Sequence, residues 1–150
     1  MYPTQGLHRS LQRHPDKIAL SHLGVGGLGA GCAAPLCSHS FRQMASAAAR
    51  QAAALAQRGV CAGDRVALLA PNHDRLVLAV LACWWLGAVA CPLNVRWTRV
   101  ELCAALLDCE PALLLADETL QMQTFVKDAP AATTRLRCST PAAPPAGPRV

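Results

Sequence analysis

The sequence predicts an α/β fold whose core is a parallel sheet built from βαβαβ crossovers, and two observations predict it. Short apolar segments at 65–70, 88–93 and 112–117 alternate with segments of helical pattern at 74–86 and 99–109. Connections of only a few residues separate them, as in right-handed β-α-β units. We therefore expect the three apolar segments to lie side by side as inner strands of one sheet, with helices layered over them.

Each element of this core has its own signal. The first strand, "RVALLA", is a continuous apolar run, which is typical of strands buried on both faces. The helix that begins at about Asp74 is closed by Gly87. The next helix begins after Thr98, because Thr98-Arg-Val-Glu101 forms a capping box. Pro111 ends that helix, and the last strand, "ALLLAD", follows.

The two ends of the chain differ from this core. "LHRSLQRH" predicts a short helix that stops at Pro15, and "KIALSHL" has the apolar content of a strand. Ser40 suits the N-cap of "FRQMASAAARQAAALAQRG", a stretch of strong helix formers that ends at Gly59. Prolines accumulate without any period near the C-terminus, so we expect residues 129–150 to form a disordered tail.

Composition and charge exclude two classes of protein. With 53% apolar and 15% charged residues, most of the chain is too hydrophobic to be disordered. The net charge is +5, but the arginines are scattered and aromatic residues make up only 4%. A nucleic-acid-binding protein concentrates its basic residues on one face or helix. We therefore expect no nucleic-acid partner.

The eight cysteines are interpreted as reduced thiols in an intracellular protein. They are Cys32, Cys37, Cys61, Cys83, Cys91, Cys103, Cys109 and Cys138. None is part of a Cys-x-x-Cys pair, and no histidine lies beside them at the spacing of zinc sites. Several fall within apolar runs, where a free cysteine behaves as a small hydrophobic residue. We expect no metal site.

One uncharged segment, residues 76–93, is just long enough to cross a bilayer. Gly87 and Pro92 interrupt it, and its alanines and cysteines dilute its hydrophobicity. A buried helix followed by a buried strand explains the segment better. We expect no membrane span, and a single-span membrane protein remains an alternative.

The stretch "GVGGLGAG" at 24–31 satisfies the pattern G-x-G-x-x-G. A dinucleotide site also needs a helix directly after the third glycine and an acidic residue about 20 positions further on. Pro35 follows instead of a helix, and residues 44–54 contain no Asp or Glu. We therefore interpret the glycines as part of a loop, residues 24–39.

A long ordered series of motifs runs from Phe41 to Asp117. It comprises "HSFRQMASAAARQAAALAQRGV", "GDRVALLAPNHDRLVLAVLACWWLGAVACPLNVRWTRVEL" and "LLDCEPALLLADE". In this order the pieces resemble the N-terminal part of the AMP-forming acyl-CoA synthetases, the AMP-dependent synthetase/ligase superfamily, with its "LTYREL" helix, PN turn and "GAVAxPLN" pattern. The resemblance implies that "KIAL" and "HSF" are arms of a β-hairpin and that residues 1–128 are a partial N-terminal domain.

Within this superfamily, "PLNVRWT" followed by "EPALLLADET" is most similar to the 2-succinylbenzoate–CoA ligases of phylloquinone and menaquinone synthesis, especially plant-type ones. The resemblance implies a two-step reaction. A carboxylate and ATP give an acyl-adenylate and pyrophosphate, and the CoA thiol then gives the thioester and AMP. ATP, Mg²⁺ and CoA are therefore the cofactors implied for the full-length family, with a small-molecule carboxylate as substrate.

The catalytic parts that the resemblance implies are missing from these 150 residues. The family uses a phosphate loop of the type T-S-G-T-T-G-x-P-K-G, an acid for Mg²⁺, an Asp for the ribose and a lysine from a C-terminal lid. No such loop follows Asp117, and Lys127 lies outside any matching motif. We assign no catalytic residue and expect an inactive fragment that binds ATP, Mg²⁺ and CoA poorly.

Three polar residues follow predicted strand ends, where ligands of parallel sheets bind. Asn72 in "PNHD", and Asn94 and Arg96 in "PLNVRW", are therefore weak candidates for substrate binding. The alternatives are a turn and N-cap role for Asn72 and a surface ion pair between Arg96 and an acid such as Glu101.

Two neighbouring pairs of residues raise further questions. His73 beside Asp74 suggests a general base, but the sequence shows no nucleophile or partner, so we expect a solvated helix start. Trp84 and Trp85 point about 100° apart on a helix. We expect one of them in the core, and the other is free to face the remainder of a ligase.

One more function class stays open beside the ligase fragment and the membrane protein. It is a non-catalytic α/β module that associates with itself or with a full-length ligase through uncovered apolar surface. The expected compartment is the chloroplast or peroxisome for a plant-type protein and the cytoplasm otherwise.

Overall fold

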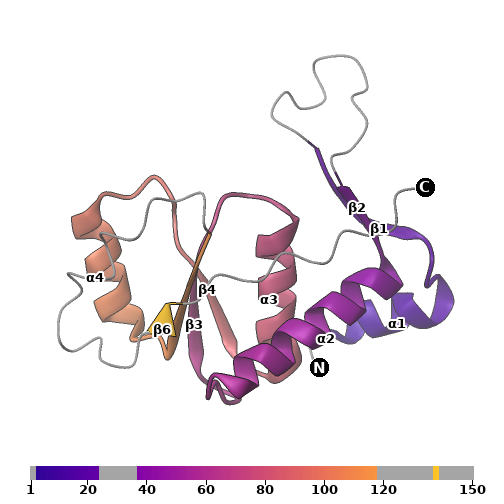
Figure 1. Ribbon diagram of the computed structural model, residues 1–150, viewed down its shortest axis with the longest axis horizontal. Helices are drawn as coiled ribbons and strands as arrows, with labels where there is room; N and C mark the ends of the chain where they lie inside the picture. The colour runs from indigo at the N-terminus through magenta and orange to yellow at the C-terminus, as the bar shows by residue number, and fades with distance from the viewer. Residues whose placement is uncertain (1–2, 24–36, 118–136, 139–150) are drawn as a thin grey trace.

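The structure is a computed structural model that describes residues 3–23, 37–117 and 137–138 (Figure 1). Its elements follow the predicted order of a helix, a hairpin, a longer helix and a β-α-β-α-β core. They are α1 (Gln5–Arg13), β1 (Ile18–His22), β2 (Cys37–Ser40), α2 (Phe41–Gln57), β3 (Arg65–Leu69), α3 (Asp74–Leu86), β4 (Val89–Pro92), α4 (Arg99–Cys109), β5 (Leu113–Ala116) and β6 (Arg137–Cys138).

The core sheet is parallel, with strand order β4-β3-β5-β6. Val66 of β3 pairs with Ala90 on one side and with Leu113 on the other, so the three predicted segments do lie side by side. The predicted inner position is wrong for β4, which is an edge strand of the described sheet. Val89 at the start of β4 is accordingly 47% exposed.

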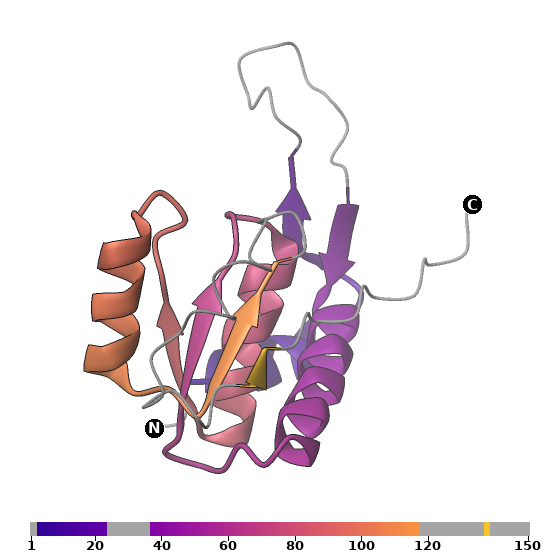
Figure 2. The same cartoon turned by 60° about the vertical axis from the view of Figure 1, so that its left-hand side comes forward.

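Helices cover both faces of this sheet (Figures 1 and 2). The helices α2 and α3 lie on one face and α4 lies on the other. Along β3, Val66 and Leu68 belong to the cluster that includes α2 and α3, whereas Ala67 and Leu69 pack with Leu102 and Leu106 of α4. The strand is buried on both faces, which explains its unbroken apolar sequence.

A separate antiparallel hairpin, β1-β2, stands beyond the N-terminal end of α3 (Figure 2). Directly opposite residues include His22 and Cys37. The predicted loop at 24–39 is too long, because residues 37–39 already pair with β1. The glycine-rich stretch itself lies outside the described residues.

The predicted helix ends are confirmed. Ser40 and Gln43 form a capping box on α2, and Thr98 and Glu101 form one on α4. Gly87 ends α3 with a φ of +81°, a left-handed conformation that glycine adopts without strain. A Cβ at this position would also lie 3.2 Å from the Cβ of Ala62, which is a crowded contact. The close approach of Ala62 is therefore a second reason for glycine here.

Within the predicted tail, residues 137–138 form β6 and pair in parallel with β5. The edge of β5 that faces away from β3 carries backbone N–H and C=O groups that need partners. A segment such as 137–138 can form hydrogen bonds with them even when its sequence lacks an apolar alternation. The remainder of 129–150, and the predicted domain boundary after residue 128, lie outside the described residues.

Residues 76–93 do not form the single continuous helix that the membrane-spanning alternative requires. The segment consists of most of α3, then Gly87, then β4, and the chain reverses direction between helix and strand. Across the described ranges no helix combines the length and apolar character needed to cross a bilayer.

Candidate functional site

Histidines and carboxylates gather where the hairpin meets the beginning of α3. His73 and Asp74 stand at the first residues of this helix, just beyond the carboxyl end of β3. Asp117 directly follows β5, the neighbouring strand. Ligands of parallel α/β sheets bind at this end of the strands, so the position of the cluster matches the usual place of a site.

His73 is the N-cap of α3 and joins the helix to β5. Its Nδ1 accepts a hydrogen bond from the backbone N–H of Leu76 at 3.2 Å, and its Nε2 lies 2.7 Å from Oδ2 of Asp117. Because a backbone N–H can only donate, Nδ1 carries no proton. Nε2 therefore carries the proton and donates a hydrogen bond to the carboxylate. The two bonds select one tautomer of a neutral imidazole.

Asp117 is the most deeply buried carboxylate of the cluster. Its side chain is 2% exposed, and its backbone N–H donates to the carbonyl of Leu69 at 2.9 Å, which continues the pairing of β5 with β3. Nη1 of Arg75 lies 3.8 Å from Oδ2. A buried carboxylate needs such partners, since an unpaired charge there is costly.

Asp74 faces the hairpin instead. His39 Nε2 lies 3.0 Å from Oδ2, and His22 Nδ1 lies 3.6 Å from Oδ1. Burial is the largest single influence on the pKa of Asp74 and raises it. The hydrogen bonds from His39 and Cys37 and the nearby histidines together outweigh burial, so the pKa lies below its ordinary value.

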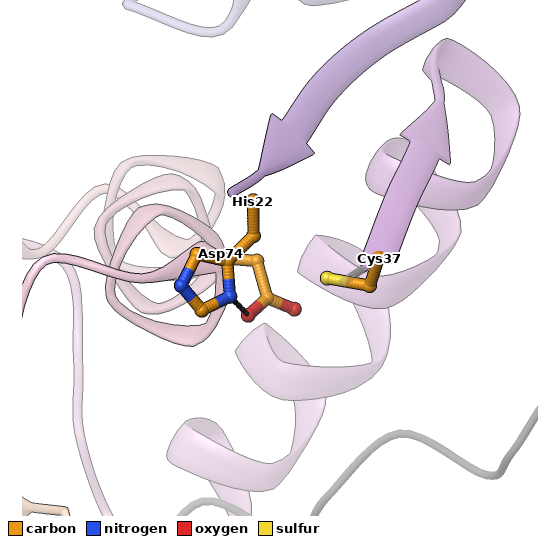
Figure 3. Close-up of side chains that lie close together, drawn as sticks. All are labelled: His22, Cys37 and Asp74. Atoms are coloured by element: carbon orange, nitrogen blue, oxygen red, sulfur yellow. Dashed lines mark ion pairs between the residues drawn. The ribbon is translucent and has the colours of Figure 1, made fainter. Parts of the chain in front are cut away.

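Cys37 completes the cluster from β2. Its Sγ lies 4.0 Å from Nε2 of His39. Ligand atoms of His22, Cys37 and Asp74 all lie within 4.8 Å of one another (Figure 3). Burial raises the pKa of the Cys37 thiol, and the charge of Asp74 and a hydrogen bond to it raise it further.

The three residues predicted as substrate candidates stand on the surface. Asn72, Asn94 and Arg96 are all exposed. The N-cap role considered for Asn72 belongs to His73. Oδ1 of Asn94 accepts from the backbone N–H of Arg96 at 2.9 Å and so shapes the turn after β4. Their part in substrate binding stays a prediction.

Two local expectations are wrong. No ion pair joins Arg96 to Glu101 among the described residues, because the Glu101 carboxylate is bound to the backbone N–H and hydroxyl of Thr98. The start of α3 is not a solvated pair, since the side chains of His73 and Asp74 are only 15% and 12% exposed. Their partners come from distant segments that spacing could not reveal.

The tryptophan expectation is confirmed as far as burial is concerned. Trp85 packs against the core cluster, and its ring lies 4.6 Å from that of His8. Trp84 is 41% exposed.

The residues present do not form a binding site for a nucleoside triphosphate. The sequence contains no Ser/Thr/Gly-rich phosphate loop, and the buried groups of the cluster are engaged with one another, as the His73–Asp117 bond shows. We therefore derive no reaction step through ATP or Mg²⁺ on these residues.

Comparison with solved structures defines the class of protein. The chain is similar to O-succinylbenzoate coenzyme A synthetase (MenE) from Bacillus subtilis, solved in complex with AMP, with 25% identity and a TM-score of 0.71 over 89% of this chain and 30% of that one. An anthranilate CoA ligase, AuaEII, in complex with anthranoyl-AMP gives a TM-score of 0.77 at 22% identity, over 93% of this chain and 25% of that one. The fold is that of the N-terminal domain of adenylate-forming enzymes.

Sequence comparison then gives the family. Residues 7–146 match the family described as AMP-binding enzyme, and the chain belongs to it. Among curated relatives, the 2-succinylbenzoate–CoA ligase of Arabidopsis thaliana is 43% identical over 68 residues, which is 45% of this chain and 12% of that protein. The feruloyl-CoA synthase of an Amycolatopsis species is 40% identical over 76 residues, 51% of this chain and 16% of that protein. The chain thus spans less than a fifth of these relatives.

Proposed function

We propose that this chain supplies the N-terminal part of an AMP-forming acyl-CoA ligase whose carboxylate substrate is 2-succinylbenzoate. The observation that carries the proposal is the similarity of this chain, over 68 residues in sequence and over 89% of its length in structure, to enzymes named as ligases of this acid. A second bacterial relative, the 2-succinylbenzoate–CoA ligase of Geobacillus kaustophilus, is 42% identical over 81 residues. Phosphate-binding groups would come from outside these 150 residues.

The proposal predicts that the 150-residue chain is catalytically silent by itself. The purified chain should show no ATP–pyrophosphate exchange with 2-succinylbenzoate or with ferulate, because the sequence lacks a phosphate loop. Exchange above the level of a heat-denatured sample would contradict the proposal that the phosphate-binding groups come from outside these 150 residues.

A chimaera tests the ligase role directly. The corresponding segment of the Bacillus subtilis synthetase is replaced by residues 7–117 of this chain, and formation of 2-succinylbenzoyl-CoA is followed by chromatography. We expect thioester formation that depends on ATP and CoA. A folded chimaera without activity, beside an active parent enzyme, would count against the proposal.

The substrate is tested on any longer product of the same gene. Sequencing of the transcript beyond codon 150 should reveal a phosphate-loop motif. The longer product should then form a thioester with 2-succinylbenzoate in preference to ferulate. A preference for ferulate would refute the substrate and leave the ligase assignment intact.

A second candidate function is association with a full-length ligase or with a second copy. It is favoured by large apolar side chains left exposed on β4 and α4, namely Val89, Val100 and Leu107. Co-purification of the tagged chain with a complete ligase would support it. A monomer by light scattering, in the presence of that ligase, would refute it.

A further inference from the structure

We propose that His22, Cys37, His39 and Asp74 form a binding site for a transition-metal dication of the Zn²⁺ type, which fastens the β1-β2 hairpin to the N-terminus of α3. The proposal is independent of the ligase activity. It rests on where four donor side chains point and on their chemistry, and Figure 3 shows three of them converging.

The backbone explains why the hairpin residues share one face. His22 and Cys37 are directly opposite each other in the antiparallel ladder. Cys37 and His39 are two residues apart on β2, and alternate residues of a strand point to the same side. Three donors therefore leave the hairpin in one direction, toward Asp74 in the first turn of α3.

The spacing of the donor atoms suits a small tetrahedral ion. Asp74 Oδ2 and His39 Nε2 are 3.0 Å apart, Asp74 Oδ1 and His22 Nδ1 are 3.6 Å apart, and Cys37 Sγ and His39 Nε2 are 4.0 Å apart. Zinc–ligand bond lengths in a tetrahedron place neighbouring donors about 3.3–3.6 Å from each other. The quoted separations lie on both sides of this range, and ligand atoms of His22, Cys37 and Asp74 lie within 4.8 Å of one another. The side chains, His39 included, would therefore have to rotate inward to close around the ion.

The donor types select the class of metal. Imidazole and thiolate favour Zn²⁺ and its neighbours, whereas Mg²⁺ and Ca²⁺ prefer oxygen ligands throughout. The side chains of His22, His39 and Asp74 are 29%, 14% and 12% exposed, so the place is sheltered and still open to an entering ion. Four protein donors leave no vacant position, which is typical of structural zinc sites.

Metal binding would replace the existing hydrogen bonds of the cluster. The Cys37 thiol would lose its proton to solvent. The proton that His39 Nε2 shares with Asp74 would pass to Nδ1 of the same ring, so that the neutral imidazole binds the metal through an unprotonated Nε2. Sequence spacing alone predicts no metal site, because the cysteines lack the Cys-x-x-Cys pattern. The proposed donors come from β1, β2 and α3, and these three segments meet only in the folded chain.

Cobalt provides the first test, because Co²⁺ occupies zinc sites and reports its ligands by absorption. The full 150-residue chain is stripped with a chelator and titrated with Co²⁺. We expect one equivalent to bind, with the visible bands of a tetrahedral site and a near-ultraviolet thiolate charge-transfer band, and we expect Zn²⁺ to displace it. Absence of saturable tetrahedral bands would overturn the proposal.

Variants assign the ligands. C37S should abolish the charge-transfer band, whereas C61S, which removes an exposed cysteine elsewhere, should keep it. H39Q and D74N should weaken binding at least as much as the roughly 10–100-fold loss typical of outer-shell substitutions. A band that survives C37S, or that C61S abolishes, would overturn the site.

A second measurement keeps the test valid if a variant folds poorly. Zn²⁺ should raise the midpoint of thermal unfolding of the unsubstituted chain and of C61S, because a ligand that binds only the folded state stabilises it. It should not raise the midpoint of C37S, whose fold is checked by circular dichroism. An equal rise in all three proteins would overturn the proposal.

Discussion

His73 Nε2 donates a hydrogen bond to Asp117 Oδ2 across 2.7 Å, so the residue that caps α3 is tied to the residue that leaves β5. The bond joins segments 44 positions apart in the sequence. It lies at the carboxyl ends of two adjacent parallel strands and is largely withdrawn from water, because the side chains of His73 and Asp117 are 15% and 2% exposed. Within the core, this contact connects the start of the β3-α3-β4 unit to the end of the β4-α4-β5 unit.

A double-mutant cycle on His73 and Asp117 should show strong coupling. H73N keeps a good N-cap residue and removes the contact to Asp117. D117N removes the charge, and it also affects Arg75, which is why the single change is not informative alone. We expect a coupling free energy of about 1–3 kcal/mol in urea unfolding, as for hydrogen bonds to charged groups. Additivity of the two changes within about 0.5 kcal/mol would contradict a direct interaction.

Acid stability should depend on Asp74. Its pKa is lowered in the folded chain from the ordinary value of 3.8. At pH values between the folded pKa and the ordinary pKa, the unfolded chain binds more protons than the folded one. The free energy of unfolding therefore falls as the pH falls. The contribution is complete above the ordinary pKa and is lost as the pH drops through the lower, folded value. Urea midpoints measured from neutral pH down to acid should therefore fall less steeply in D74N.

The matched control for this experiment is D16N, which removes an exposed carboxylate that pairs with Arg42. It should leave the acid-induced fall nearly intact, since exposed ion pairs contribute little to stability. Equal flattening in D16N and D74N would show that general charge, and not the contacts of Asp74 to His39 and Cys37, governs the acid response.

Local signals in the sequence predict nearly all of the core fold. The unbroken apolar run of β3, the capping box at Thr98 and the glycine at 87 each act over a few residues, and each has the predicted effect. The sequence does not predict the edge position of β4, because an apolar strand has the same composition whether one or two neighbouring strands pair with it. The order of strands is a property of the whole sheet.

The candidate site could not be predicted in the same way. His22, Cys37 and Asp74 come from three elements, and their convergence depends on the register of the hairpin and on how it meets α3. The sequence does show a histidine and an acid shortly after a buried strand, at positions 73 and 74. Position alone does not indicate partners, and His39 and Asp117 are distant in sequence.

The capping box of α4 should contribute measurably to stability. Thr98 accepts from the backbone N–H of Glu101, and Glu101 in turn accepts from the backbone N–H of Thr98 at 2.7 Å. T98A should lower the free energy of unfolding by about 0.5–2 kcal/mol. T98S retains a hydroxyl at the cap and should lose little. If T98S and T98A are equally destabilised in urea unfolding, the methyl group and not the cap is responsible.

Thiol reactivity should separate buried from exposed cysteines. Burial, and to a lesser extent the charge of Cys91, raises the pKa of the Cys83 thiol to about 11. At pH 8 about one thousandth of it is thiolate, the form that reacts with iodoacetamide. Cys83 is also fully buried between α3 and the sheet, whereas Cys61 is exposed. Peptide mass spectrometry should therefore find Cys61 alkylated well before Cys83 in the folded chain, and both alkylated together in denaturant. Equal labelling of the two without denaturant would mean that α3 does not stay packed on the sheet, because no local rearrangement exposes Cys83 while the core cluster around it remains closed.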